Sequence, residues 1–211
     1  KSRFIEHLLD PMASEYVYAS HVYGGFQIAL AAVCQRLGKK ATIFCAKRKI
    51  PHQNSLKCKA LGASVLQVPH GYLSNVQKKA KDYCVRKNAQ YLEFGANYAL
   101  AIDKIAEVME EVTRQIGEPE IIFCAVGSGT LLKGIIKGTN TSNIIGVQVG
   151  KEFNDAVPSR VKLLKYPKNF ETISKQKNSF PSCENYDLKA WEYCLKHYNP
   201  KQKTFFWNVM G

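Results

Sequence analysis

The chain has 211 residues, 45% of them hydrophobic, which is enough to bury a core in one domain or in two small ones. No apolar run approaches the roughly 20 residues that a membrane-spanning helix needs, so we expect no membrane span. The net charge is +13, but the basic residues lie in short scattered runs, which is more typical of a solvated surface than of a nucleic-acid footprint.

Seven cysteines are scattered along the chain without a Cys-x-x-Cys pair. Such a pattern favours a reducing compartment over a disulfide framework, so we expect a cytoplasmic protein. It also argues against a zinc centre, and no metal site is expected. The sequence begins at Lys1 without a methionine or the pattern of a signal peptide, and we expect that it has been trimmed or processed upstream.

Helices and strands are predicted to alternate through the first half of the chain. The apolar periodicity and the Gly and Pro breaks predict helices at 3–9, 26–37, 52–61 and 73–86, and strands at 15–20, 41–45, 64–68 and 91–94. Gly38 is expected to terminate the second helix as a C-cap residue. A junction is expected near Asn97.

The second half opens with a long amphipathic helix predicted at 98–116. Strands follow at 121–126, 144–149, 161–164 and 204–207, with helices at 130–137 and 186–197 and an irregular stretch at 165–184. This alternation predicts an α/β protein of two small domains, 1–97 and 98–211, each with a parallel sheet covered by helices.

Two glycine turns lie where ligands bind in such folds. Gly127-Ser128-Gly129 joins a buried strand to a helix, and Gly24-Gly25 occupies the same position in the first half. Glycines allow a close backbone approach, and a helix start offers N–H groups and a positive dipole end to a phosphate. An ordinary strand-to-helix turn is the competing interpretation. We predict a cleft between the halves near Gly24, Gly127 and Asn208.

Several stretches together resemble the fold-type II family of pyridoxal-phosphate enzymes, and most closely its aminocyclopropane-carboxylate deaminase and D-cysteine desulfhydrase branch. The segments that carry the resemblance are Lys1 to Leu9, Ser20 to Leu30, Leu37 to Val65, Val126 to Leu131 and Phe206 to Gly211. The most specific part is the glycine turn combined with residues 37 to 65. The resemblance implies a shortened tryptophan synthase β-like fold.

It also implies a set of site residues. Lys1 falls on the lysine that carries the cofactor, and it would act as anchor and proton shuttle. Cofactor-binding residues carried over from the family are Gly24, Gly25, Phe26, Gly127, Ser128, Gly129, Thr130 and Asn208. The sequence departs from the family at Gly25, which replaces an asparagine that bonds the ring oxygen, and at Val209, which replaces a threonine facing the ring nitrogen.

The expected function is that of a pyridoxal-phosphate-dependent lyase or deaminase-like protein that acts on a small amino acid. The departures at Gly25 and Val209 motivate an alternative, a catalytically inactive relative that serves as a binding or scaffolding protein. A nucleic-acid-binding module is a third and weaker alternative. The expected partner is a small amino-acid substrate, and a homodimer is a possible assembly. No membrane partner is expected.

Overall fold

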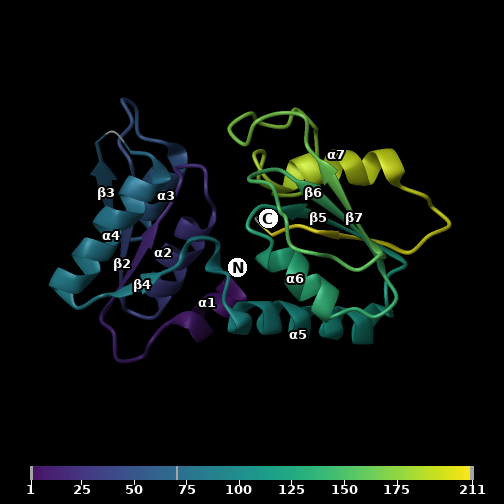
Figure 1. The fold of residues 1–211 in the computed structure, drawn as a ribbon, viewed down its shortest axis with the longest axis horizontal. Coiled ribbons are helices and arrows are strands. Elements are labelled where there is room, and N and C mark those ends of the chain that lie inside the picture. Colours follow the sequence, from purple (N-terminus) through teal and green to yellow (C-terminus); the bar gives the residue numbers. More distant parts are fainter. Residues whose placement is uncertain (1, 70, 210–211) are drawn as a thin grey trace. The chain divides into compact units, whose positions relative to one another are not determined.

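The computed structural model describes residues 2–69 and 71–209, and Figure 1 shows their fold. The chain divides into two compact units, Lys1–Ala96 and Asn97–Gly211. Each unit contains one four-stranded sheet in which every strand pairing is parallel. The predicted α/β class, with parallel sheets covered by helices, is confirmed.

The first unit has the strand order β3-β2-β1-β4. Its strands are β1 Glu15–Ala19, β2 Lys40–Ala46, β3 Ser64–Val68 and β4 Gln90–Leu92, and its helices are α1 Ser2–Leu8, α2 Phe26–Arg36, α3 Gln53–Ala60 and α4 Leu73–Lys87, followed by a 3₁₀ turn, η1 Phe94–Ala96. The sheet is thus assembled from successive strand–helix units, with β1 and β2 in its interior.

Alternate residues of β1 face opposite layers of this unit. Val17 and Ala19 belong to a buried cluster with Ala80 of α4, whereas the Tyr18 ring lies 4.5 Å from that of Phe26 in α2. Successive side chains of a strand point to opposite faces. Helices therefore cover the sheet on both sides, which is why every residue of β1 is buried.

The second unit has the strand order β7-β6-β5-β8. Its strands are β5 Ile121–Val126, β6 Asn143–Gln148, β7 Val161–Lys165 and β8 Thr204–Trp207, and its helices are α5 Ala99–Ile116, α6 Thr130–Lys137 and α7 Asp187–His197. Ala125 and Val147 pack in a buried cluster with Ala190 of α7.

The α5–α6 pair packs through glycines. An added Cβ at Gly134 would lie 2.4 Å from Ile105, and one at Gly138 would lie 2.5 Å from the carbonyl oxygen of Ala106. Both distances are too short for a real side chain, so these two positions let the backbone of α6 press directly onto α5. This contact sets the position of α6, whose first turn adjoins the glycine turn after β5.

Small differences from the sequence-based prediction occur at element ends. The strand predicted at 91–94 stops at Leu92, because Gly95 has φ 81° and turns the chain into η1. The C-cap of α2 is Leu37, one residue before the predicted Gly38, which follows with φ 64° and ends the helix. No helix in the described part of the chain is long and apolar enough to cross a membrane.

A single carboxylate organises the turn between α6 and β6. One oxygen of Glu118 accepts hydrogen bonds from the backbone N–H groups of Asn140 (2.9 Å), Thr141 (2.7 Å) and Ser142 (3.0 Å), and from the Ser142 hydroxyl (3.0 Å). Burial on its own would raise the pKa of Glu118, but these donors favour the charged form and lower the pKa to about 2.

We therefore expect Glu118→Gln to destabilise the protein in a pH-dependent way. The folded pKa lies below the unfolded value, so the carboxylate stabilises the fold fully above about pH 5, and this contribution is lost as the pH falls towards 2. After allowance for solvent screening, the loss at pH 7 should be about 1–2 kcal/mol.

Chemical denaturation of both proteins at pH 7 and pH 3 measures the effect. The stability difference should shrink markedly at pH 3. Glu110→Gln, on the exposed side of α5, is the matched control and should change stability little at either pH. An equal loss for Glu118→Gln at both pH values would contradict the argument.

Candidate cofactor site

The turn between β5 and α6 requires glycine at two positions. Gly129 has φ 88°, and an added Cβ would lie 2.1 Å from Cε2 of Phe153. A Cβ at Gly127 would lie 3.0 Å from Cε2 of Tyr186. Two aromatic rings thus pack against the turn, and a residue other than glycine would force one of them away.

The donors around this turn suit an anion. Gly129 is the N-cap of α6 and supplies no side chain to cap the helix, and the first turn contains no acidic residue. A helix start presents backbone N–H groups that the helix itself does not use, together with a positive dipole end. The hydroxyl groups of Ser128 and Thr130 lie 3.2 Å apart at the same point. This donor set fits a phosphate group.

Tyr186 acts as a support beneath the turn. Its hydroxyl donates to the carbonyl oxygen of Ala125 at 3.3 Å, and the backbone of Gly127 forms a hydrogen bond with it. Burial, assisted by the neighbouring Asp187, raises the pKa of Tyr186 well above its ordinary value. The phenol therefore lies against Gly127, where it holds the backbone as a neutral group.

Asn208 lies at the same edge of the sheet as the glycine turn. The two strands β5 and β8 pair in parallel, with Cys124 opposite Trp207, so the residues that follow both strands are neighbours. The Asn208 amide donates to the Pro181 carbonyl oxygen at 2.7 Å and accepts from the Ser182 hydroxyl at 3.0 Å. Both ends of the amide are therefore engaged by the segment that precedes α7.

A buried carboxylate that sequence reasoning missed adjoins Asn208. Asp187 is fully buried at the start of α7, and its Oδ1 accepts from the backbone N–H of Val209 at 3.2 Å. No sequence motif marks Asp187, because its role depends on β8 ending beside α7. The Val209 side chain, as the sequence indicated, brings no polar group to this edge.

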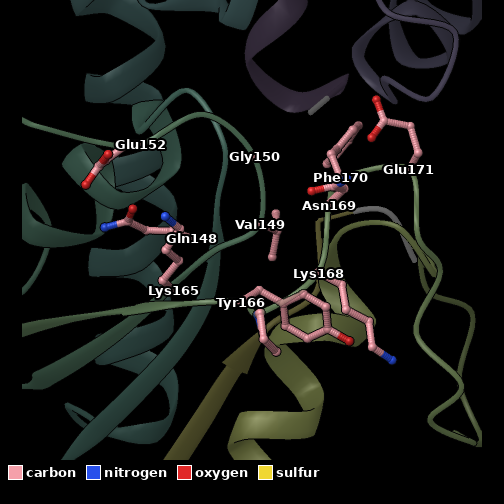
Figure 2. A pocket seen from close by; sticks show the side chains of 11 residues that line it. Gln148, Val149, Gly150, Glu152, Lys165, Tyr166, Lys168, Asn169, Phe170 and Glu171 are labelled. Carbon is pink, nitrogen blue, oxygen red and sulfur yellow. The ribbon is translucent and has the colours of Figure 1, made fainter.

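A pocket of about 400 Å³ opens at the carboxyl ends of β6 and β7, and Figure 2 shows its lining. The lining residues are Gln148, Val149, Gly150, Glu152 and 165–171. Gly150 connects the pocket to the glycine turn, since a Cβ added to it would lie 3.7 Å from the Cα atom of Gly127. The pocket therefore borders the candidate phosphate site.

Lys189 supports one wall of this pocket from behind. Its side chain is fully buried and donates to the carbonyl oxygens of Asn169 (2.9 Å) and Phe170 (3.0 Å). Its Nζ also lies 4.9 Å from the centroid of the Tyr166 ring. Burial lowers the pKa of Lys189. These contacts fix the segment that leaves β7, which contributes most of the lining in Figure 2.

In the first unit, the turn between β1 and α2 is equally tight. A Cβ at Gly24 would lie 2.6 Å from Ser20 Oγ. Gly25 has φ −87° and is the N-cap of α2, without a side-chain cap. The Phe26 side chain is buried against Tyr18, so any contact of Phe26 with a cofactor would involve its backbone.

Gln27 holds this turn and was not singled out from the sequence. Its Nε2 donates to the carbonyl oxygens of His21 (3.2 Å), Val22 (2.9 Å) and Gly24 (2.7 Å). The side chain is fully buried, and its Oε1 has no hydrogen-bond partner within the described part of the chain. Three acceptors around one nitrogen fix the orientation of the amide. A glutamine early in a helix gives no signal of such a role.

Lys1, on which the family's cofactor lysine falls, lies outside the described residues. Among the residues that the structure describes, no group of His, Cys, Asp or Glu is placed to hold a metal ion. None of the cysteines that the structure describes forms a disulfide. Burial raises the pKa of Cys124, which lies in β5 just before the glycine turn, to about 12, so this thiol is not a nucleophile at neutral pH.

A match to a known protein family establishes the family of this chain. Residues 10–190 match the model of the pyridoxal-phosphate dependent enzyme family. The chain belongs to this family. Pyridoxal phosphate is therefore the cofactor of the family, and the glycine turn at the start of α6 supplies a donor set that fits its phosphate group.

Solved structures share the fold. An ACC deaminase homologue aligns with a TM-score of 0.81 at 16% identity, covering 98% of this chain and 77% of the other. Threonine deaminase isoform 2 from Solanum lycopersicum aligns with a TM-score of 0.58 at 22% identity, and the alignment covers 69% of this chain and 40% of the other. Maize serine racemase aligns with a TM-score of 0.59 at 18% identity, and the alignment covers 69% of this chain and 44% of the other. These likenesses confirm the fold-type II architecture, and no curated protein matches the sequence significantly.

Ser128 offers a direct test of the phosphate site, because it is exposed and its conversion does not disturb the two glycines. Ser128→Asp places a carboxylate at the helix start, and we expect uptake of pyridoxal phosphate to fall at least tenfold through charge repulsion. Ser128→Ala keeps the backbone N–H groups and should lower affinity only a few-fold.

Titration of the apoprotein with the cofactor, followed by absorbance, gives both affinities, and the thermal midpoints show whether each variant is folded. Equal affinities for the Asp and Ala variants would reject the assignment of the phosphate to this turn.

Proposed function

We propose that the chain binds pyridoxal phosphate and acts as a lyase or deaminase on a small amino acid. The observation that carries this proposal is the turn at Gly127–Thr130. It combines an uncapped helix start, a first turn without acidic residues and two converging hydroxyl groups. Within a family that depends on pyridoxal phosphate, this donor set is the natural site for the phosphate.

Each part of the chain then has a defined task. The start of α6 would bind the phosphate, while Tyr186 and Phe153 keep the turn in its binding conformation. Gln27 would hold the β1–α2 turn, where the family places its second cofactor contact. When bound, the cofactor supplies an electron sink for a carbanion at the amino-acid substrate. Lys1 is the proposed anchor of the cofactor, because it falls on the lysine that carries the cofactor in the family.

We also propose that residues 1–97 and 98–211 are the two domains of this enzyme. The division of the fold into compact units between Ala96 and Asn97 supports that boundary. The break at Gly117 and Pro119 lies inside the second unit, between α5 and β5, and is not a domain boundary.

A second candidate function has a specific basis. At Gly25 the chain has no side chain to meet the cofactor ring, and both ends of the Asn208 amide are engaged by Pro181 and Ser182. Asn208 would have to release these partners before it replaced the polar group that the family has at Val209. A chain that retains phosphate binding without turnover, and serves as a binding protein, is therefore the alternative.

Cofactor loading and peptide mapping separate the two functions. For the enzyme, we expect one equivalent of bound pyridoxal phosphate, a single borohydride-reduced adduct on Lys1, and turnover of D-cysteine, L-serine or aminocyclopropane-carboxylate within the usual range of roughly 1–1,000 per second. Lys1→Ala should abolish the adduct, whereas the control Lys87→Ala, at the end of α4, should not.

An adduct scattered over surface lysines, with no turnover of any of these amino acids, would establish the inactive alternative instead. Phosphate binding at Gly127–Thr130 would survive in that case, since it does not depend on Lys1.

A further inference from the structure

An arginine, Arg48, lies near the β1–α2 turn and forms no ion pair with the residues that the structure describes. Tyr23 belongs to that turn, and Arg48 follows the end of β2, the strand next to β1 in the parallel sheet. Both residues therefore lie at the carboxyl edge of this sheet. Ligands of open parallel sheets bind at that edge.

Aromatic contacts hold the arginine in place. The Cζ atom of Arg48 lies 5.9 Å from the centroid of the Tyr23 ring. The His52 ring packs edge-on against the same tyrosine, with centroids 4.7 Å apart and an interplanar angle of 72°. A guanidinium over an aromatic face is attracted by the ring and loses less entropy when it binds an anion.

His52 is itself fixed by hydrogen bonds. Its Nδ1 accepts a hydrogen bond from the backbone N–H of Asn54 at 3.2 Å, and its ring is bonded to the backbone of Val22. Burial and the nearby charge of Arg48 lower its pKa. The cluster therefore holds the positive charge of Arg48 beside two packed aromatic rings.

The surroundings of Arg48 provide no counter-charge. Arg48 and its exposed neighbours Lys47 and Lys49 form no ion pair with any residue that the structure describes. In the same unit, the described ion pairs are those of Arg36 with Glu6, Lys40 with Glu15 and Lys81 with Glu93. Residues 1–96 contain 15 basic and 5 acidic residues and so account for +10 of the net +13.

We infer that Arg48 determines specificity for an amino acid that carries a second anionic group, a carboxylate or a phosphate, on its side chain. The inference rests on the proposed function, because it assigns the substrate class of that enzyme. The planar guanidinium presents paired N–H donors that match a carboxylate or a phosphate in bidentate fashion. Tyr23 and His52 are positioning residues that hold it.

Calorimetric titration of the full chain tests this assignment, with O-phospho-L-serine, L-aspartate and L-serine as probes at constant ionic strength, with and without pyridoxal phosphate. We expect at least one anionic probe to bind about tenfold or more tightly than L-serine. The stronger of the two identifies the anion as phosphate or carboxylate.

Arg48→Gln should reduce that preference to about twofold and leave the affinity for L-serine unchanged. Arg86→Gln removes the same charge from α4, where Arg86 donates to the carbonyl oxygen of Asp82, and should retain the preference. Tyr23→Phe keeps the aromatic face and should retain it too, whereas Tyr23→Leu should lose part of it. A retained preference in the Tyr23→Phe protein also shows that the site is folded.

The outcomes separate the two claims. An Arg48-dependent preference in a protein that takes up no pyridoxal phosphate would sustain the anion site and overturn the proposed function. A protein that takes up the cofactor but binds L-serine as tightly as both anionic probes would overturn the inference alone. Equal losses for Arg48→Gln and Arg86→Gln would reduce the effect to overall charge and also overturn it.

Discussion

The structure of the second unit depends on the close approach of backbone to aromatic rings at one turn. Gly129, with its left-handed φ, leaves room for Phe153, and Gly127 leaves room for Tyr186. The turn can tighten in this way because the next helix is pressed onto α5 through Gly134 and Gly138. Glycines thus act at two levels, first placing α6 and then shaping the turn at its start. An anion site made of backbone N–H groups needs both, since backbone donors cannot adjust as side chains do.

Single polar side chains hold several loops in both units. Gln27 donates to three carbonyl groups, Lys189 to two, and Glu118 accepts from three backbone N–H groups. Arg160 likewise donates to the carbonyl oxygens of 136, 139 and 142. Buried backbone groups outside helices and strands must find partners, and one multivalent side chain satisfies several at a small entropic cost. The loops are therefore rigid without regular secondary structure.

The sequence predicted nearly every element, because strong apolar periodicity and glycine breaks mark the ends of strands and helices in a parallel α/β fold. It also located the glycine turn, whose residues are adjacent in the chain. It missed Gln27 and Asp187, because their roles arise from tertiary neighbours that no local pattern encodes. Asp187 meets Val209 only because β8 pairs with β5 and ends beside α7.

The net positive charge is distributed unequally between the two units, which the overall composition does not show. The second unit, which contains the glycine turn at the start of α6, has 15 basic and 12 acidic residues. Its small net charge attracts anions only weakly, so anion binding there depends on the local donors of the turn. The first unit carries most of the excess, yet its glycine turn offers no acidic or basic side chain of its own. A positive potential acts over about 8 Å at physiological salt, which is within reach of a ligand at the same sheet edge. The general potential attracts any anion, whereas Arg48 can bind one in a defined orientation, because its guanidinium lies against the Tyr23 ring.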